Sequence, residues 1–197
     1  MAKNAGDVIL RDRMQFELGA GGDRSTLYGR IDLSNYINPV KRAGLAVKEI
    51  RFMVRNPAGA LGNTGALQPV ADFFSPSGST GVQSNIKLYA TTRAYENASE
   101  VGIASPDVLC VLEKFSVVGA SPAGTAPSLL VWEDWYGPKD LHPEGYTVVS
   151  DLLIGVAADN WLLLAEETLE VDIMLIAEPI TITTERMNEI LSQAQDL

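Results

Sequence analysis

The chain has 197 residues, of which 46% are hydrophobic and 20% are charged, and this length is enough for one domain to bury its own core. The formal net charge of -10 argues against non-specific binding of nucleic acid by the chain as a whole. The single cysteine, Cys110, excludes an intrachain disulfide, and its place inside the apolar run 108–112 predicts a buried thiol.

The first residues and the longest apolar runs bear on export and membrane insertion. Residues 1–7 are polar and lack the charged-then-apolar layout of a secretory signal. No run approaches the roughly 20 apolar residues of a membrane span. We therefore expect a soluble protein that is made without Sec-type export.

Charge is unevenly distributed along the chain. Residues 1–55 carry ten Lys/Arg and six Asp/Glu, a balance of +4, whereas residues 56–197 have a balance of -14. Two interpretations are open. The solvated surface is simply uneven, or the basic portion meets something anionic inside an assembly or across a subunit contact.

Eight runs have β-strand patterning, since they are short, rich in β-branched and aromatic residues, and bounded by Gly, Pro and Ser. In chain order they are 14–18, 26–33, 45–54, 85–93, 108–118, 128–133, 146–155 and 169–177. Their spacing is looser than that of a hairpin meander and predicts strands that cross between two sheets. We predict an all-β fold, an eight-stranded jelly-roll or β-sandwich domain over residues 1–182.

A long insertion, residues 56–84, separates the third and fourth strands. It is built from Gly, Pro, Ser, Asn and Thr, and a loop of this length in a compact domain is usually functional or disordered. Phe73 and Phe74 within it are apolar enough to dock on the body of the protein or on a neighbouring molecule.

Trp132, Glu133, Asp134, Trp135 and Tyr136 place aromatic side chains beside carboxylates, as sugar-binding surfaces do. Adjacent residues of a strand point to opposite faces, so the two carboxylates should not converge, and Trp132 is expected in the core.

The end of the chain is helical in pattern. Residues 161–167 are ambiguous between a short helix and the lead-in to the last strand. Over 183–197, after a start that can cap a helix, apolar residues recur at helical spacing and predict a short amphipathic helix. Its apolar stripe must pack on its own β domain or on an adjacent subunit.

Residues that could carry a reaction or hold a metal are sparse. The single histidine, His142, lies beside a proline in a turn-like segment and has no second histidine near it. No nucleophile elbow, phosphate-binding loop or zinc-protease motif occurs. One acidic cluster consists of Glu166, Glu167, Glu170 and Asp172. It could bind a cation, but an acidic edge strand that resists aggregation is the favoured explanation.

The strands at 45–54, 86–93, 108–118, 146–155 and 169–177, with the insertion 56–84, together resemble a single-jelly-roll capsid protein of an icosahedral virus. Small RNA-virus and circular single-stranded DNA-virus coats carry an Arg-rich N-terminal arm. Here the first 23 residues offer only Lys3, Arg11 and Arg13. The chain is more similar to small capsid proteins of double-stranded DNA viruses that have an internal membrane or separate packaging machinery.

The resemblance implies a non-enzymatic, cofactor-free structural protein that assembles into a capsid shell, is made in the host cytoplasm and resides in the virion. Its implied partners are copies of itself and a second capsid or penton protein, with no sequence-specific nucleic acid. The mildly basic N-terminal part would contact an internal membrane or the genome indirectly. The residues expected at subunit interfaces are Phe73, Phe74, Met187, Ile190, Leu191 and Leu197.

Three other classes remain open. A phage tail-tube or baseplate protein would also be a β-sandwich with a long loop and a helix, and would stack into rings. A carbohydrate-binding module would use Trp132, Trp135 and Tyr136 and stay monomeric. An enzyme is the weakest option, because the groups it would need are missing or unpaired.

Overall fold

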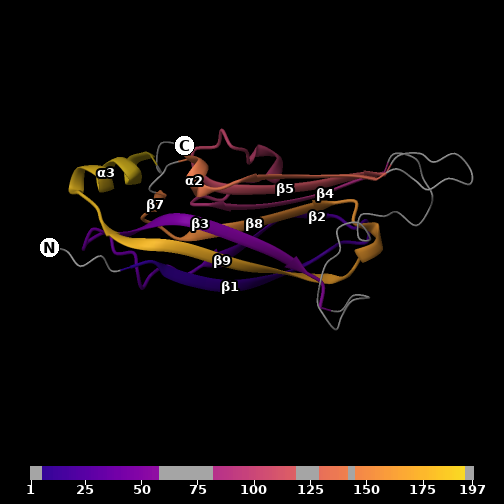
Figure 1. The fold of residues 1–197 in the computed structure, drawn as a ribbon, viewed down its shortest axis with the longest axis horizontal. Coiled ribbons are helices and arrows are strands. Elements are labelled where there is room, and N and C mark those ends of the chain that lie inside the picture. Colours follow the sequence, from indigo (N-terminus) through magenta and orange to yellow (C-terminus); the bar gives the residue numbers. More distant parts are fainter. Residues whose placement is uncertain (1–5, 58–81, 119–128, 142–144, 194–197) are drawn as a thin grey trace, which may run out of the picture.

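A computed structural model describes residues 6–57, 82–118, 129–141 and 145–193. Within these ranges, nine strands form two antiparallel sheets that lie face to face (Figure 1). The first sheet has the order β1-β9-β3-β7 and the second β2-β8-β4-β5-β6. The strands of the first sheet are β1 (Val8–Glu17), β9 (Thr168–Thr181), β3 (Ala43–Arg55) and β7 (Tyr146–Val148). Those of the second are β2 (Arg24–Ile31), β8 (Leu152–Asp159), β4 (Val82–Thr91), β5 (Val108–Val118) and β6 (Leu129–Tyr136).

The strand order is that of a jelly roll. Every connection between successive strands crosses from one sheet to the other, except in the meander β4-β5-β6. The first and last strands of the chain therefore pair with each other, and β1 and β9 run antiparallel over their whole common length. The predicted all-β sandwich with strands that cross between sheets is confirmed.

The described part of the chain has nine strands where eight were predicted, because the run 146–155 is divided. Residues 146–148 pair with β3 in the first sheet, whereas β8 begins at Leu152 and pairs with β2 and β4 in the second. Ser150 is exposed at the bend between them. The run therefore spans the crossing between the sheets, with buried residues such as Val148 and Leu152 on either side of the exposed bend.

The core fills the space between the two sheets, and a β-bulge sets which residues of β3 reach it. The register of β3 against β9 shifts between Val47 and Glu49, so Lys48 is an extra residue in the strand. Leu45 and Val47 are fully buried before the bulge, and Ile50 is fully buried after it. The bulge therefore changes which alternate residues of β3 face the core.

The predicted insertion, residues 56–84, begins directly after β3, and its last residues overlap the start of β4. β3 ends at Arg55 and β4 begins at Val82. Phe73 and Phe74, the predicted interface residues of this insertion, lie outside the described residues, as does His142.

Three short helices lie between strands of the described part of the chain, and one of them falls in the segment 161–167 that the sequence left ambiguous. Residues 162–164 form a 3-10 helix, η2 (Leu162–Leu164), between β8 and β9. A four-residue helix, α2 (Pro138–Leu141), follows β6, and a second 3-10 helix, η1 (Ala98–Glu100), lies between β4 and β5. Among the residues described, no helix is long and apolar enough to cross a membrane.

The predicted terminal helix is present as α3 (Thr184–Gln193), at the end of the sandwich where β7 lies (Figure 1). The Thr183 hydroxyl accepts the Arg186 backbone N–H at 3.2 Å and caps the first turn. Met187 is buried against Val149 and Ile182. The apolar stripe of α3 therefore packs, at least at this position, on its own β domain.

Replacing Met187 with alanine should lower the free energy of unfolding by about 2 kcal/mol, because it removes a buried side chain that the surrounding structure cannot fully replace. Chemical denaturation followed by circular dichroism measures this change. Glu189→Ala is the matched control on the same helix, since Glu189 is exposed, and it should stay within about 0.5 kcal/mol of the parent protein. Equal midpoints for both variants would show that α3 does not dock through Met187.

Cys110 is fully buried, and burial raises the pKa of its thiol. The folded protein should therefore react with Ellman's reagent at pH 8 at least a hundredfold more slowly than the protein in guanidinium chloride. Because Cys110 is the only cysteine of the chain, the absorbance change reports this site alone. Rapid reaction of the folded protein would contradict the buried position of Cys110 on β5.

Candidate functional site

The outer face of the first sheet carries a regular array of charged and apolar side chains, here named the arginine face. Phe16, Ile173 and Ile50 point into the core, so the alternate residues of β1, β9 and β3 point outward. The backbone register aligns these outward residues in four rows across the sheet. The rows are Ile9–Ile176–Glu49, Arg11–Met174–Arg51, Arg13–Asp172–Met53 and Gln15–Glu170–Arg55.

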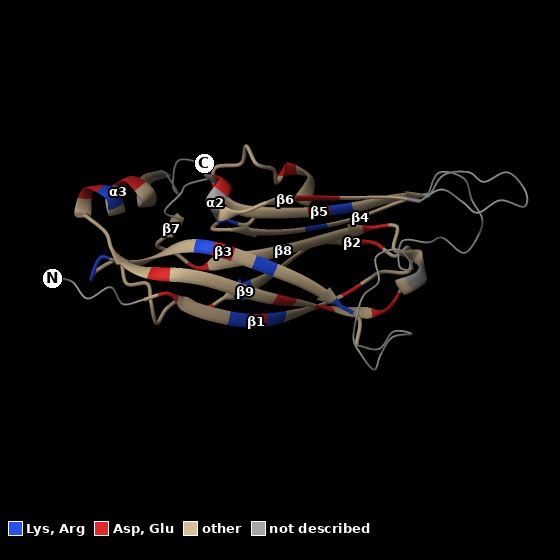
Figure 2. Cartoon of the chain, in the orientation of Figure 1, with Lys and Arg blue, Asp and Glu red and all other residues tan. Residues whose placement is uncertain are grey.

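Ion pairs across the strands order much of this face. In Figure 2, positive residues on β1 and β3 flank negative residues on β9. Asp172 lies 2.5 Å from the Arg13 guanidinium and 3.7 Å from that of Arg55. Arg13 also pairs with Glu170 at 3.5 Å, and its pKa is raised chiefly by the hydrogen bond to Asp172. The carboxylates of β9 thus hold arginines of the two neighbouring strands.

The explanation of Glu170 and Asp172 as protective charges of an edge strand was wrong. β9 lies between β1 and β3, and both of its edges are paired. Glu167 accepts a hydrogen bond from Asn56 at 2.7 Å, and Glu166 is exposed at a turn with φ 64°. Within the described ranges, no three His, Cys, Asp or Glu side chains come together as a metal site would require.

Apolar side chains on the arginine face are unusually open to solvent. Met53 is 62% exposed and Ile9 is 50% exposed, and Met174 is half-buried between them in the register. Arg11, Arg51, Met53 and Met174 help to line a shallow depression of about 890 Å³. The depression is also lined by Asp12 and Asp172, so it combines exposed apolar side chains with charges of both signs, and apolar side chains exposed together mark a surface that binds another molecule.

The second candidate surface is strand β6, residues 129–136, here named the tryptophan edge. The second sheet has one strand more than the first, and β7, at the corresponding edge of the first sheet, is only three residues long. Leu130 is 57% exposed and Trp132 is 55% exposed. The prediction that Trp132 lies in the core was wrong, because its side chain is on the outer face of the second sheet, opposite Phe115.

The side chains of the tryptophan edge alternate between two faces. Trp132 lies opposite Phe115 on the outer face, and their rings stack with centroids 6.3 Å apart. Trp135 points inward and meets the Phe52 ring edge-on at 6.0 Å. Glu133 pairs with Lys114 at 2.6 Å. The two tryptophans therefore do not form one platform for a sugar ring, and Glu133 and Asp134 lie on opposite faces, as the strand alternation predicted.

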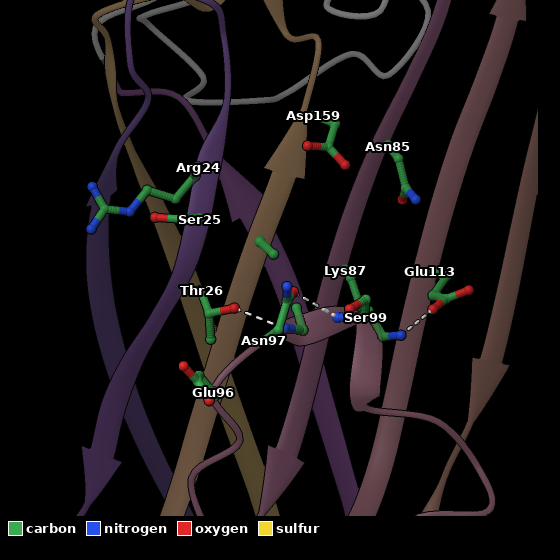
Figure 3. A pocket seen from close by; sticks show the side chains of 12 residues that line it. Arg24, Ser25, Thr26, Asn85, Lys87, Glu96, Asn97, Ser99, Glu113 and Asp159 are labelled. Carbon is green, nitrogen blue, oxygen red and sulfur yellow. Dashed lines mark hydrogen bonds and ion pairs between the residues drawn. The ribbon is translucent and has the colours of Figure 1, made fainter.

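A polar pocket of about 430 Å³ lies under the segment that follows β4 (Figure 3). Its polar groups make contacts within the second sheet, within that segment and between the two. The Thr26 hydroxyl accepts the Ala98 backbone N–H at 2.8 Å, and the Asn97 side chain accepts that of Ser99 at 3.1 Å. The ammonium of Lys87 binds Glu113 at 2.6 Å. The Thr26 contact therefore fastens η1 to β2, whereas the Lys87 ion pair joins β4 to β5.

The interface residues predicted from the sequence are only partly placed. Met187 and Ile190 lie on α3 in the small cluster against β9 and residue Val149, so they serve the fold of the chain itself. Leu191 is within α3, and Leu197 lies outside the described residues. The arginine face was not predicted from the sequence, although the spacing of two between Arg11 and Arg13 and of four between Arg51 and Arg55 places each pair on one face of a strand and was a usable signal.

Comparisons with known proteins give little to build on. No family model matches the chain, and no curated protein matches it. A solved structure from Desmodium yellow mottle tymovirus aligns with 93% of this chain and 95% of its own, at 9% sequence identity and a TM-score of 0.32. A similarity this low carries no inference about what the chain does.

Proposed function

We propose that this chain is a structural subunit that assembles with copies of itself into the capsid shell of an icosahedral virus. The observation that carries the proposal is the presence of two exposed apolar surfaces on a sandwich whose own core is filled. The exposed groups are contiguous in the register of the sheets rather than scattered, and contiguous apolar patches mark surfaces that bind other molecules.

The architecture suits a subunit that tiles. Buried positions between the sheets are occupied by large apolar side chains, which makes the sandwich a rigid block. Two or more weak contacts per subunit would multiply through avidity into a stable assembly. On this proposal the protein resides in the virion after synthesis in the host cytoplasm, and a second capsid or penton protein would complete the shell. The same proposal includes a virus with a double-stranded DNA genome, the class whose small capsid proteins the sequence resembles.

Size-exclusion chromatography with light scattering tests the proposal on the full chain over a series of protein and salt concentrations. We expect a mass that rises with protein concentration toward large, regular oligomers. A strictly monomeric mass under every condition would refute self-assembly. In that case a glycan titration that follows tryptophan fluorescence would test the carbohydrate-binding alternative, which uses the exposed ring of Trp132.

A further inference from the structure

We propose that the tryptophan edge of one copy docks on the arginine face of a second copy of this chain, with Asp134 of one copy next to Arg11 of the other. The inference rests on the proposed self-assembly and specifies one of its contacts. A second copy is the expected partner because the two surfaces complement each other: each exposes apolar side chains, and their charges are opposite.

The first of the two docking surfaces is the outward side of β6 in the tryptophan edge. Leu130, Trp132 and Asp134 alternate along this side. Trp132 is held by its stack on Phe115, so little side-chain entropy would be lost when a partner covers it. The surface thus presents a fixed aromatic anchor with one carboxylate two residues away.

The second docking surface is the depression in the arginine face. Its apolar groups, Met53 and Met174, come from neighbouring strands, and Arg11 lies beside Met174 in the same row of the sheet. Methionine side chains adapt to an aromatic partner and make favourable sulfur–ring contacts. A tryptophan over these methionines would place a carboxylate two residues away within reach of the arginine row.

The charges supply the specific match. Arg13, Arg51 and Glu133 each pair with an opposite charge inside the chain. Arg11 and Asp134 make no ion pair or side-chain hydrogen bond to any residue that the structure describes, and both are exposed. Complementary unpaired charges beside complementary apolar surfaces favour one orientation and one register of docking.

The two surfaces lie on opposite outer sides of the sandwich, since one belongs to the first sheet and the other to the second. Each copy therefore carries one tryptophan edge and one arginine face, on opposite sides. A contact of this kind is heterologous, and it continues from copy to copy until a ring or shell closes or a filament grows.

Charge reversal on the full chain tests the inference. Asp134→Arg and Arg11→Asp are made singly and together, and light scattering gives the protein concentration at half-assembly. Each single variant sets like charges against each other, so we expect that concentration to rise at least tenfold. The double variant restores an opposite pair in the reversed sense and should return within about threefold of the parent protein.

Glu96→Arg is the matched control, because it makes the same charge change at an exposed position on the same side of the sandwich and should leave the half-assembly concentration unchanged. All variants should keep the melting temperature of the parent. Single variants that assemble like the parent, or a double variant as impaired as the singles combined, would overturn the docking inference while self-assembly stands. A parent protein that never assembles would instead refute the proposed function.

An anionic occupant of the arginine face is the competing result. Binding to phosphatidylglycerol vesicles and to double-stranded DNA is measured for the parent and for Arg11→Asp. If Arg11→Asp abolishes such binding and leaves assembly unchanged, the face binds an anionic surface and the inference is wrong. Assembly that changes while vesicle and DNA binding stay absent supports the contact between copies.

Discussion

Replacing Gly155 with alanine is expected to lower the free energy of unfolding by about 3 kcal/mol. Gly155 lies on β8 directly under the Tyr89 ring, and an added Cβ would overlap three ring atoms. Tyr89 is fully buried, its ring meets Tyr28 edge-on, and its hydroxyl donates to that of Tyr28 at 2.9 Å. The ring therefore cannot move aside without breaking a buried contact, and overpacking of this kind is costly.

Thermal unfolding by circular dichroism measures the effect, which for a chain of this size corresponds to a fall in Tm of about 6–12 °C. Gly102→Ala is the matched control, because a Cβ at Gly102 meets no atom within 4 Å. In a double-mutant cycle with Tyr89→Leu, the combined cost should be smaller than the sum of the two single costs. A Tm for Gly155→Ala equal to that of Gly102→Ala would contradict the packing of β8 beneath Tyr89.

Replacing Trp161 with alanine is expected to lower the free energy of unfolding by about 4 kcal/mol, the range found for fully buried tryptophans. The Trp161 side chain is 1% exposed, and its Nε1–H donates to the Asn85 carbonyl at 3.0 Å. Its backbone N–H donates to the Gly22 carbonyl at 2.9 Å. Trp161 thus links the β1–β2 turn to β4 and closes one end of the sandwich.

Urea denaturation monitored by far-ultraviolet circular dichroism measures this loss in Trp161→Ala, because that signal does not depend on the deleted fluorophore. The neighbouring substitution Leu162→Ala is the control, since Leu162 is 44% exposed and should cost less than about 1 kcal/mol. Trp161→Phe keeps most of the buried area but leaves the Asn85 carbonyl without this donor, so we expect an intermediate loss of about 2 kcal/mol. A larger loss of unfolding free energy in Leu162→Ala than in Trp161→Ala would contradict the buried position of Trp161.

The fold class followed from local patterns, because strand alternation and helical spacing are properties of neighbouring residues. Residues 108–118 were predicted as a strand, and β5 has those bounds. What the local pattern could not supply was the lateral order of the strands. Glu170 and Asp172 suggested an edge strand, yet β9 lies in the centre of its sheet and the arginines that neutralise these carboxylates come from β1 and β3.

The same reason explains the errors at the candidate surfaces. Trp132 lies in an apolar run typical of a core strand, and only the pairing of β6 with β5 shows that its side chain is on the outer face of the sheet. The bulge at Lys48 reversed the faces of β3 locally. The arginine face needs three strands in register, and two of them, β1 and β9, are more than 150 residues apart in the sequence. Sequence alone could identify its arginines but could not bring them together.

Electron microscopy of the purified full chain at the concentrations where light scattering shows large particles tests the central claim most directly. The proposed function predicts closed, regular shells, or rings that are fragments of them. Open tubes would contradict the shell and support the tail-tube alternative, and a field of single small particles at every concentration would contradict assembly altogether.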